Sequence, residues 1–293
     1  MMHVSFLSFL LSACGDVENK NDDGNIDNED TGEVKYYPPG CFIVDGGDGY
    51  ALLNDAIEVA DEGSTITMLG CDSSHEELVV IQKSISIEGP GADMMTLSGP
   101  VNETTITIEG ASNVSISGLN IDTTRTGIEI IGSDNVTLSD LTFSTGAYGI
   151  KSDGSTLSID NSSFSFLQFG GMELKNSTTT LSNLIFDQNI SSGIFIDGGT
   201  TTASNLTVNN TLPTDMDIPE DGYGIIVDGG GDLVVQEATF DANLFAGLYV
   251  VRGNLTLNDA LISNSALASI FSDPNSGSVT LENVNAVDNL NYG

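Results

Sequence analysis

The chain has 293 residues, with 7 Lys and Arg against 42 Asp and Glu and a formal net charge of −35. So acidic a chain excludes a nucleic-acid partner, because its few cations cannot form a basic face. It contains no Trp and 33 Gly. These features are typical of an extracellular β protein, whose length suits either two ordinary domains or one extended repeat array.

Residues 1–14 predict an export signal. An apolar run from Val4 to Leu11 is followed by Ser-Ala and then Cys14. The run is too short to span a bilayer, so we expect a removable segment. It resembles a bacterial lipoprotein signal, although no Lys or Arg precedes it, and this resemblance implies that Cys14 is lipidated and is the only link to a membrane. An ordinary secretory signal is the alternative. We therefore expect a protein of the bacterial cell envelope, lipid-anchored at the outer surface or in the periplasm, or otherwise a secreted one.

Residues 15–36 predict an acidic disordered linker. Between Gly15 and Val34 there is no aromatic residue and one isoleucine. Such a segment cannot bury enough apolar surface to fold, and its carboxylates repel one another.

The two remaining cysteines, Cys41 and Cys71, are expected to pair. An exported protein meets an oxidising environment, in which two such thiols form a disulfide. The bridge would fasten the N-terminal end of the folded region. Two free thiols are the alternative.

Residues 37–100 predict an N-terminal cap. Apolar residues between Ala51 and Ala60 recur at helical spacing, which indicates a short helix with one buried face formed by Leu52, Leu53, Ala56, Ile57 and Ala60. Strand-like runs follow, including Gly63–Met68 and Lys83–Gly91. The order of helix and runs resembles the cap and first coils of many secreted β-helix proteins.

From Val114 onward one motif recurs about every 22 residues. Its clearest copies are Val114–Ile121, Val136–Phe143, Leu157–Phe164, Thr179–Phe186 and Thr201–Val208. Between the copies stand four glycines at intervals of 22 residues, Gly127, Gly149, Gly171 and Gly193. Alternating β-branched residues separated by Gly, Asn and Asp are typical of strands. A period of this size predicts the coils of a parallel β-helix, in which equivalent residues stack at about 4.8 Å.

The stacking predicts two inward columns and one column of turns. The inward columns are Ile116, Leu138, Ile159, Leu181, Ala203, Val235, Leu257 and Leu281, and Ile121, Phe143, Phe164, Phe186, Val208, Phe240 and Ile262. The turn column is Asp140, Asn161, Asn183 and Asn205, residue types that tolerate a left-handed backbone. Stacked turn asparagines and inner aromatics resemble the pectate-lyase-like superfamily of right-handed β-helices.

This resemblance covers the chain from about Cys41 to its end. It implies an all-β fold, a right-handed parallel β-helix over residues 37–293 with a short N-terminal capping helix. We expect the cap at 37–100 and regular coils at 101–293. Because the last coil has no capping element, we also expect the C-terminal end to be truncated.

The outward residue of each Gly-apolar-x-apolar strand changes character along the chain. Side chains alternate faces along a strand, so the third residue of this pattern points outward. In the early coils it is charged, as Glu129, Lys151 and Glu173. In the later coils it is large and apolar, as Phe195, Ile226, Tyr249 and Phe271. We interpret these four residues, the hydrophobic strip, as a ligand-binding face. The alternative is that the inserted loop Thr211–Asp221 covers them.

Two acidic groups are candidate calcium ligands, because Ca²⁺ prefers carboxylate and carbonyl oxygens. The inserted loop supplies Asp215, Asp217, Glu220 and Asp221, although their spacing matches no known calcium loop. Asp197 and Asp228 form the second group. On adjacent coils they would repel by roughly 1 to 3 kcal/mol, so either the turns splay or a cation lies between them.

No catalytic residue is predicted. The superfamily's hydrolases carry Asn-x-Asp, Asp-Asp, Gly-His-Gly and Arg-x-Lys motifs, but here the sole Asp-Asp pair lies in the linker and the sole histidine after the signal is His75. Its lyases use an Arg or Lys base with Ca²⁺, and Arg125 and Arg252 lack the flanking motif. A lyase base at Lys151 or Lys175 stays open.

The leading functional hypothesis is a secreted or surface-anchored binding or adhesion module without its own catalysis. Its partner would be a polysaccharide or a cell-surface molecule. The alternative is a polysaccharide lyase or glycoside hydrolase of the pectate-lyase-like superfamily, with calcium as its candidate cofactor. A purely structural spacer is the third possibility.

Overall fold

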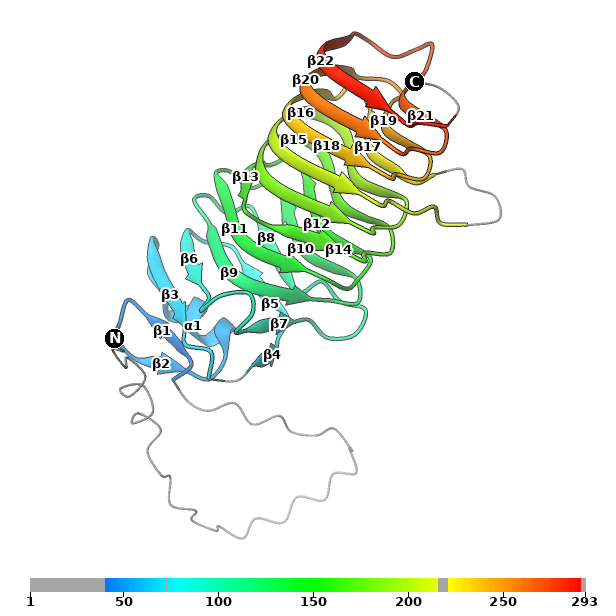
Figure 1. Ribbon diagram of the computed structural model, residues 1–293. Helices are drawn as coiled ribbons and strands as arrows, with labels where there is room; N and C mark the ends of the chain where they lie inside the picture. The colour runs from blue at the N-terminus through cyan, green and yellow to red at the C-terminus, as the bar shows by residue number, and fades with distance from the viewer. Residues whose placement is uncertain (1–39, 72, 216–220, 291–293) are drawn as a thin grey trace, which may run out of the picture. The chain divides into compact units, whose positions relative to one another are not determined.

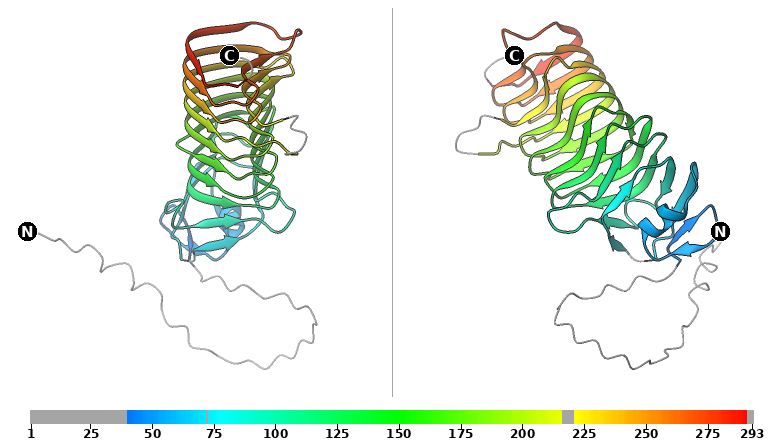
Figure 2. Two further views of the ribbon diagram at one scale, coloured as in Figure 1. Left: turned by 45° about the vertical axis from the view of Figure 1, so that its right-hand side comes forward. Right: turned by 180° about the vertical axis from the view of Figure 1, so that it is seen from behind.

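The computed structural model describes residues 40–71, 73–215 and 221–290. These residues belong to one compact unit, a stack of coils that runs from the N-terminal strands to the C-terminal coil (Figures 1 and 2). The predicted signal with Cys14 and the predicted linker lie outside the described residues. In the described part of the chain, no helix has the length and apolar character needed to cross a membrane.

Each coil contributes strands to three columns, and within a column every strand pairs in parallel with the strands of neighbouring coils. Glu173, for example, pairs with Lys151 on one side and with Phe195 on the other. Each of these residues is 22 positions from the next in sequence, as the repeat predicts. This parallel stacking confirms the predicted all-β parallel β-helix.

The first column contains the Gly-apolar-x-apolar strands. Its members are β5 (Val79–Ile81), β8 (Ile106–Glu109), β10 (Thr126–Ile131), β12 (Tyr148–Asp153), β17 (Tyr223–Asp228), β19 (Ala246–Val250), β21 (Ala268–Ser272) and the first parts of β15 (Gly170–Asp187) and β16 (Ser192–Asn209).

The second and third columns are separated by a bend, which several strands cross without a break. The second column comprises β3 (Ser64–Met68), β6 (Ile85–Glu88), β13 (Thr156–Asp160) and the leading halves of β9 (Ser115–Asp122), β11 (Val136–Phe143), β18 (Asp232–Asp241), β20 (Asn254–Ser263) and β22 (Val279–Val287). The third column comprises β4 (Ser74–Glu76), β7 (Thr96–Ser98), β14 (Ser163–Ser165) and the trailing halves of the strands that cross. Strands β15 and β16 run through all three columns.

The bend is made by the predicted turn column. Asp140, Asn161, Asn183 and Asn205 all have positive φ, between 46° and 55°. Their side chains also bond from coil to coil, as the Asn205 amide does in donating to Asn183 Oδ1 over 2.7 Å. Residues that tolerate the left-handed region therefore turn the chain once per coil at the same position.

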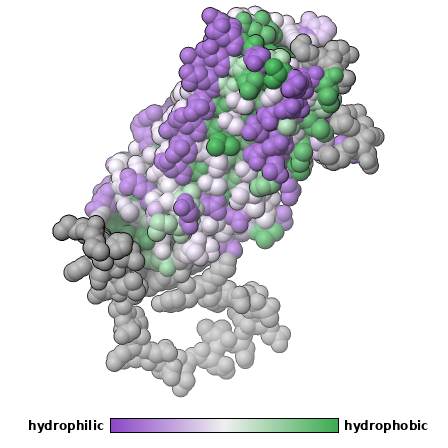
Figure 3. Space-filling view, in the orientation of Figure 1, coloured by the Kyte–Doolittle hydropathy of each residue, from purple (hydrophilic) through white to green (hydrophobic). Residues whose placement is uncertain are grey.

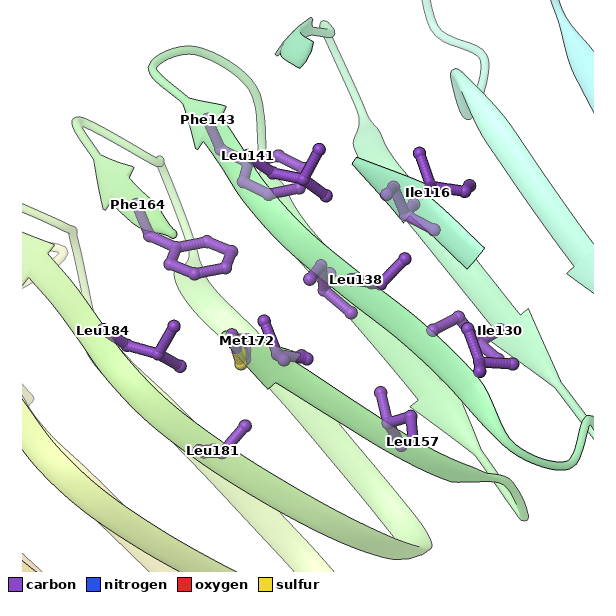
Figure 4. Packing of buried hydrophobic residues seen from close by; sticks show 14 of the residues in the cluster. Ile116, Ile130, Leu138, Leu141, Phe143, Leu157, Phe164, Met172, Leu181 and Leu184 are labelled. Atoms are coloured by element: carbon purple, nitrogen blue, oxygen red, sulfur yellow. The ribbon is translucent and has the colours of Figure 1, made fainter. Parts of the chain in front are cut away.

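Both predicted inward columns lie in the core, part of which is drawn in Figure 4, with the exception of Leu281. Leu281 is 49% exposed, because no further coil covers it among the described residues. Phe143, Phe164 and Phe186 are fully buried and stack with ring centroids 4.7 and 4.8 Å apart. The rings pack against the glycine column, since a Cβ on Gly149 would lie 2.6 Å from Phe164 Cδ1. The 22-residue glycine period is thus the complement of the phenylalanine stack.

The N-terminal cap begins with antiparallel pairing. Strand β1 (Phe42–Val44) pairs with β2 (Gly49–Tyr50) and with β3, and helix α1 (Leu53–Val59) follows β2. The helix is shorter than the predicted segment, and Leu52 is 37% exposed, outside the buried face to which the sequence assigned it. Leu52 is the residue before the helix and is extended, so its side chain does not follow helical spacing.

Glu77 caps the N-terminus of helix α1, because Leu52 at the N-cap position has no side chain that can accept a hydrogen bond. The Glu77 carboxylate accepts hydrogen bonds from the backbone N–H groups of Leu53 and Asn54 over 2.7 and 2.9 Å, and lies 2.7 Å from Nε2 of buried His75. Burial raises the pKa of the Glu77 carboxyl, but these hydrogen bonds outweigh burial and hold that pKa below its ordinary value. The ionised Glu77 carboxylate therefore stabilises the fold fully above the ordinary pKa of Glu, and this stabilisation is lost as the pH falls through the lowered pKa of Glu77.

The predicted disulfide between Cys41 and Cys71 is present, with the two Cα atoms 5.7 Å apart. It joins the start of β1 to the chain that follows β3. Because β1 and β3 also pair with each other, the bridge and the backbone hydrogen bonds fix the same antiparallel pair of strands.

Candidate functional site

The candidate site is the outward face of the first column. Strand pairing places the predicted outward residues in one line, in the order Glu129, Lys151, Glu173, Phe195, Ile226, Tyr249 and Phe271. The first three are half-buried charged residues and the last four form the hydrophobic strip. The face therefore has a charged part and an apolar part.

The charged part is organised around Lys151. Its Nζ lies 2.8 Å from Glu173 Oε2 and 4.6 Å from the centre of the Tyr148 ring. Burial and the negative charge of Glu173 raise the pKa of the Tyr148 hydroxyl, which Lys151 opposes. A shallow polar pocket opens here, and it is also lined by Glu129, Asp153 and Lys175. The alternating charges compensate one another, and Lys151 is an ammonium held between a carboxylate and an aromatic ring.

The apolar part is larger than the predicted strip. Tyr223 stacks on Tyr249 with ring centroids 4.8 Å apart, and it lies 4.9 Å from the ring of Phe245. Tyr249 in turn meets Phe271 edge to face at 5.2 Å. We call these four residues the aromatic patch. Tyr223 is almost fully buried, Phe245 and Tyr249 are half-buried, and Phe271 is 40% exposed.

Small residues beneath the rings make this arrangement possible. Tyr223 pairs with Ala246, and Ala246 pairs with Ala268 on the next coil. The three side chains form a small apolar cluster against which Ile226, Phe245 and Tyr249 pack. Since alanines occupy the two following positions, the Tyr223 ring can lean over them and contact Tyr249.

Figure 3 shows how hydrophobic and hydrophilic side chains are distributed over one face of the molecule. In the orientation of Figure 1, hydrophilic residues follow the coils and hydrophobic residues are visible toward the C-terminal coils.

The predicted pair Asp197 and Asp228 lies on adjacent coils, as the register requires. The positive charge beside it comes from the chain itself. Arg252 Nε donates to Asp228 Oδ1 over 2.7 Å and its Nη2 donates to Oδ2 over 3.1 Å. The hydrogen bond from Arg252 lowers the pKa of the Asp228 carboxyl despite partial burial. These two carboxylates alone do not fit calcium, which takes six to eight oxygen ligands.

The acidic loop is described only in part. Asp217 and Glu220 lie outside the described residues, and the Asp221 carboxylate accepts hydrogen bonds from the backbone N–H and the hydroxyl of Thr214. Among the residues that the structure describes, no group of three or more His, Cys, Asp or Glu side chains is placed to hold a metal ion. Calcium binding by Asp215, Asp217, Glu220 and Asp221 stays a prediction.

A family comparison decides what kind of protein carries this face. The family model described as "Right handed beta helix region" matches residues 104–214 and 192–293. The chain belongs to the right-handed β-helix family. The handedness predicted from the sequence is thereby confirmed. By sequence, no curated protein matches this β-helix.

Solved structures similar to this β-helix include enzymes that are named for polysaccharides. An alginate lyase from Paenibacillus sp. str. FPU-7 has a TM-score of 0.62 at 16% identity, covering 82% of this chain and 95% of that one. Pectate lyase Pel9A has a TM-score of 0.56 at 10% identity, covering 84% and 73% respectively. The catalytic domain of a GH87 α-1,3-glucanase has a TM-score of 0.53 at 15% identity, covering 90% of this chain and 60% of that one. At these identities the likeness shows the fold alone, which is the right-handed parallel β-helix that the sequence predicted.

The sequence missed two members of the aromatic patch, Tyr223 and Phe245. A partial signal for Tyr223 was present, because it directly precedes Gly224 as Tyr148 precedes Gly149. Strand alternation did not place it with the strip, since Tyr223 and Ile226 are three residues apart and a two-residue period assigns them to opposite faces. Phe245 lies in the turn before β19, where the strand period gives no direction for a side chain.

Proposed function

We propose that this β-helix binds a polysaccharide along the outward face of its first column. The observation that carries the proposal is the aromatic patch, in which rings from adjacent coils contact one another and Phe271 is 40% exposed. Contiguous apolar surface on a protein usually marks a binding site, and aromatic rings combine a large contact area with little conformational entropy to lose. The likeness to enzymes named for alginate, pectate and α-1,3-glucan supports a polysaccharide as the partner.

Replacing the most accessible rings tests this proposal. We expect Tyr249→Ala combined with Phe271→Ala to weaken polysaccharide binding by about 10- to 30-fold, which is the usual cost of removing aromatic anchors from an interface. The measurement is affinity electrophoresis of the full chain in gels that contain a panel of neutral, acidic and amino polysaccharides, followed by calorimetry with those that retard it.

Phe166→Ala is the matched control, because Phe166 is 57% exposed but lies in the turn after β14, away from the patch. The control should bind as the unaltered protein does. Equal binding by the patch variant and the unaltered protein would contradict the proposal and favour a structural spacer.

A second candidate function, catalysis on the same polymer, is favoured by the charged part of the face. Glu129 and Glu173 are two coils apart, which separates their backbones by about 9.6 Å, and Lys151 lies between them. Inverting glycoside hydrolases use two carboxylates about 6.5 to 9.5 Å apart. Any polymer that binds should therefore be assayed for new reducing ends and unsaturated products. Turnover that Glu173→Gln abolishes would replace the binding-only proposal with an enzymatic one.

We also propose that the protein is exported and held to a membrane by a lipid on Cys14. The disulfide between Cys41 and Cys71 supports an oxidising compartment. In a bacterial host, Cys14→Ser should move the full chain from the membrane fraction to the soluble fraction, because no second anchor is expected. Fractionation with immunoblotting measures the shift. A variant that stays in the membrane fraction would refute the lipid anchor.

A further inference from the structure

The aromatic patch has carboxylates beside two of its rings. Asp221 is close enough to Tyr223 to act on its ionisation, and burial, Tyr249 and Asp221 together raise the pKa of Tyr223 to about 12. Burial, Asp273 and Asp228 likewise raise the pKa of the Tyr249 hydroxyl. Burial is the largest cause of both shifts, and strand geometry places the carboxylates independently. Asp228 and Asp273 follow Ile226 and Phe271 by two residues, so alternation directs them to the same outward face as the patch.

Basic side chains that could compensate these carboxylates are scarce. After Lys175 the sequence contains one basic residue, Arg252, and both carboxylate oxygens of Asp228 already accept hydrogen bonds from its guanidinium. Asp221 and Asp273 have no basic residue in an ion pair with them among the described residues. An anionic ligand at the patch would therefore meet carboxylates with no available cation to balance them.

A ligand with protonated amines would instead be attracted to these carboxylates. An ammonium group over a tyrosine ring is attracted by the negative face of the ring, and nearby carboxylates add to the attraction. Lys151 shows the same chemistry within the chain, since its Nζ lies over the Tyr148 ring and beside Glu173. An amino-sugar unit can present its ring to Tyr249 or Phe271 and its ammonium to Asp273 or Asp221.

We infer that the aromatic patch takes a polysaccharide of amino sugars with free, protonated amines, and that it discriminates against polyuronates. The inference rests on the proposed function, because it names the substrate class of the same face. It commits the patch to one ligand chemistry and orders the others: cationic chains bind best, uncharged chains less well, and anionic chains least.

Two oligosaccharides with the same backbone, one with free amines and one with acetylated amines, provide the test. Oligomers of β-1,4-linked glucosamine and of N-acetylglucosamine, equal in length, are titrated into the full chain by calorimetry, together with an alginate oligomer. We expect the free-amine oligomer to bind roughly tenfold more tightly than the acetylated one. The alginate oligomer should bind most weakly.

Removing two carboxylates from the patch distinguishes attraction by the patch from attraction by the net charge of the whole protein. Asp221→Asn with Asp273→Asn should reduce the tenfold preference to less than about threefold and leave binding of the acetylated oligomer unchanged. Asparagine still accepts the hydrogen bonds that Thr214 and Asn275 donate at these positions. The matched control is Glu237→Gln with Asp259→Asn, which removes the same charge at the bend between the second and third columns.

Each other outcome has a definite meaning. Equal affinity for the amine and acetylated oligomers, or tighter binding of alginate, would overturn the inference and leave the proposed function standing. An equal loss in the control pair would show attraction by net charge alone and would also overturn it. If none of the oligomers or polysaccharides binds, the proposed function itself fails.

Discussion

Phe164→Ala is expected to lower the free energy of unfolding by about 3 to 5 kcal/mol, the usual cost of truncating a buried phenylalanine. The ring is fully buried and stacks between Phe143 and Phe186 with nearly parallel planes. Its loss leaves a cavity in the middle of the stack, because the coils on both sides are held at fixed spacing by backbone hydrogen bonds. Urea unfolding followed by circular dichroism measures the change.

Phe166→Ala is again the control, since it removes the same atoms from an exposed site two residues away. It should change the free energy of unfolding by less than about 0.5 kcal/mol. A Phe164 variant as stable as this control would show that the three rings do not form an interior column. The parallel β-helix would then lose its main packing support.

The glycine column explains why the period of the repeat was so informative. A Cβ on Gly127, Gly149 or Gly171 would lie within 2.9 Å of a ring carbon of the phenylalanine stack and of a backbone oxygen on the next coil. Only glycine fits at these positions, so the residue recurs in each coil from Gly127 to Gly247. Periodic constraints of this kind can be read from the sequence, because the same contact is made once per coil.

The candidate site was predictable only in part for the same reason. The hydrophobic strip follows from strand alternation, and the register places Phe195, Ile226, Tyr249 and Phe271 as expected. The contact between Tyr223 and Tyr249 depends instead on the direction in which one ring leans over the alanines of the following coils. Rotamers of outward side chains are not periodic, so this contact could not be predicted from the repeat.

The ion pair between Asp228 and Arg252 was missed because the spacing departs from the repeat. The two residues are 24 apart, so the simple 22-residue register does not align them. The register predicted that Asp197 and Asp228 lie on adjacent coils, and the strand pairing confirms it. The arginine on the following coil was not predicted as the neighbouring cation.

A series of asparagines, two of them buried and the third half-buried, was missed as well. Three residues after the inward side chain of the third column, every second coil carries an asparagine: Asn189, Asn243 and Asn289. Each accepts a hydrogen bond from a backbone N–H of the preceding coil and donates one to a backbone carbonyl there. These amides form hydrogen bonds with backbone N–H and C=O groups that strand pairing leaves unsatisfied, at the turn that leads back to the first column.

Asn243→Leu is expected to lower the free energy of unfolding by about 2 to 6 kcal/mol, because it leaves two buried backbone groups unpaired at roughly 1 to 3 kcal/mol each. Asn243 is fully buried, its Oδ1 accepts from the Thr211 N–H and hydroxyl over 3.2 and 2.6 Å, and its Nδ2 donates to the Val208 carbonyl over 2.9 Å. Leucine has nearly the same shape, so the change isolates the hydrogen bonds. Asn205→Gly is the control. It removes an exposed side-chain bond at a turn that glycine tolerates, and should cost less than about 1 kcal/mol.

Asn243→Leu should also weaken polysaccharide binding, because Asn243 links the start of the inserted loop to the patch. Thr211 begins the loop, and its carbonyl accepts from the Leu244 N–H, while the Phe245 N–H donates to Gly222 where the loop returns. Loss of the Asn243 bonds therefore loosens both Phe245 and the segment that carries Asp221. Calorimetry at a temperature where the variant remains folded separates this effect from unfolding. Unchanged stability together with unchanged binding would show that the buried amides are dispensable and that the turn is held by backbone pairing alone.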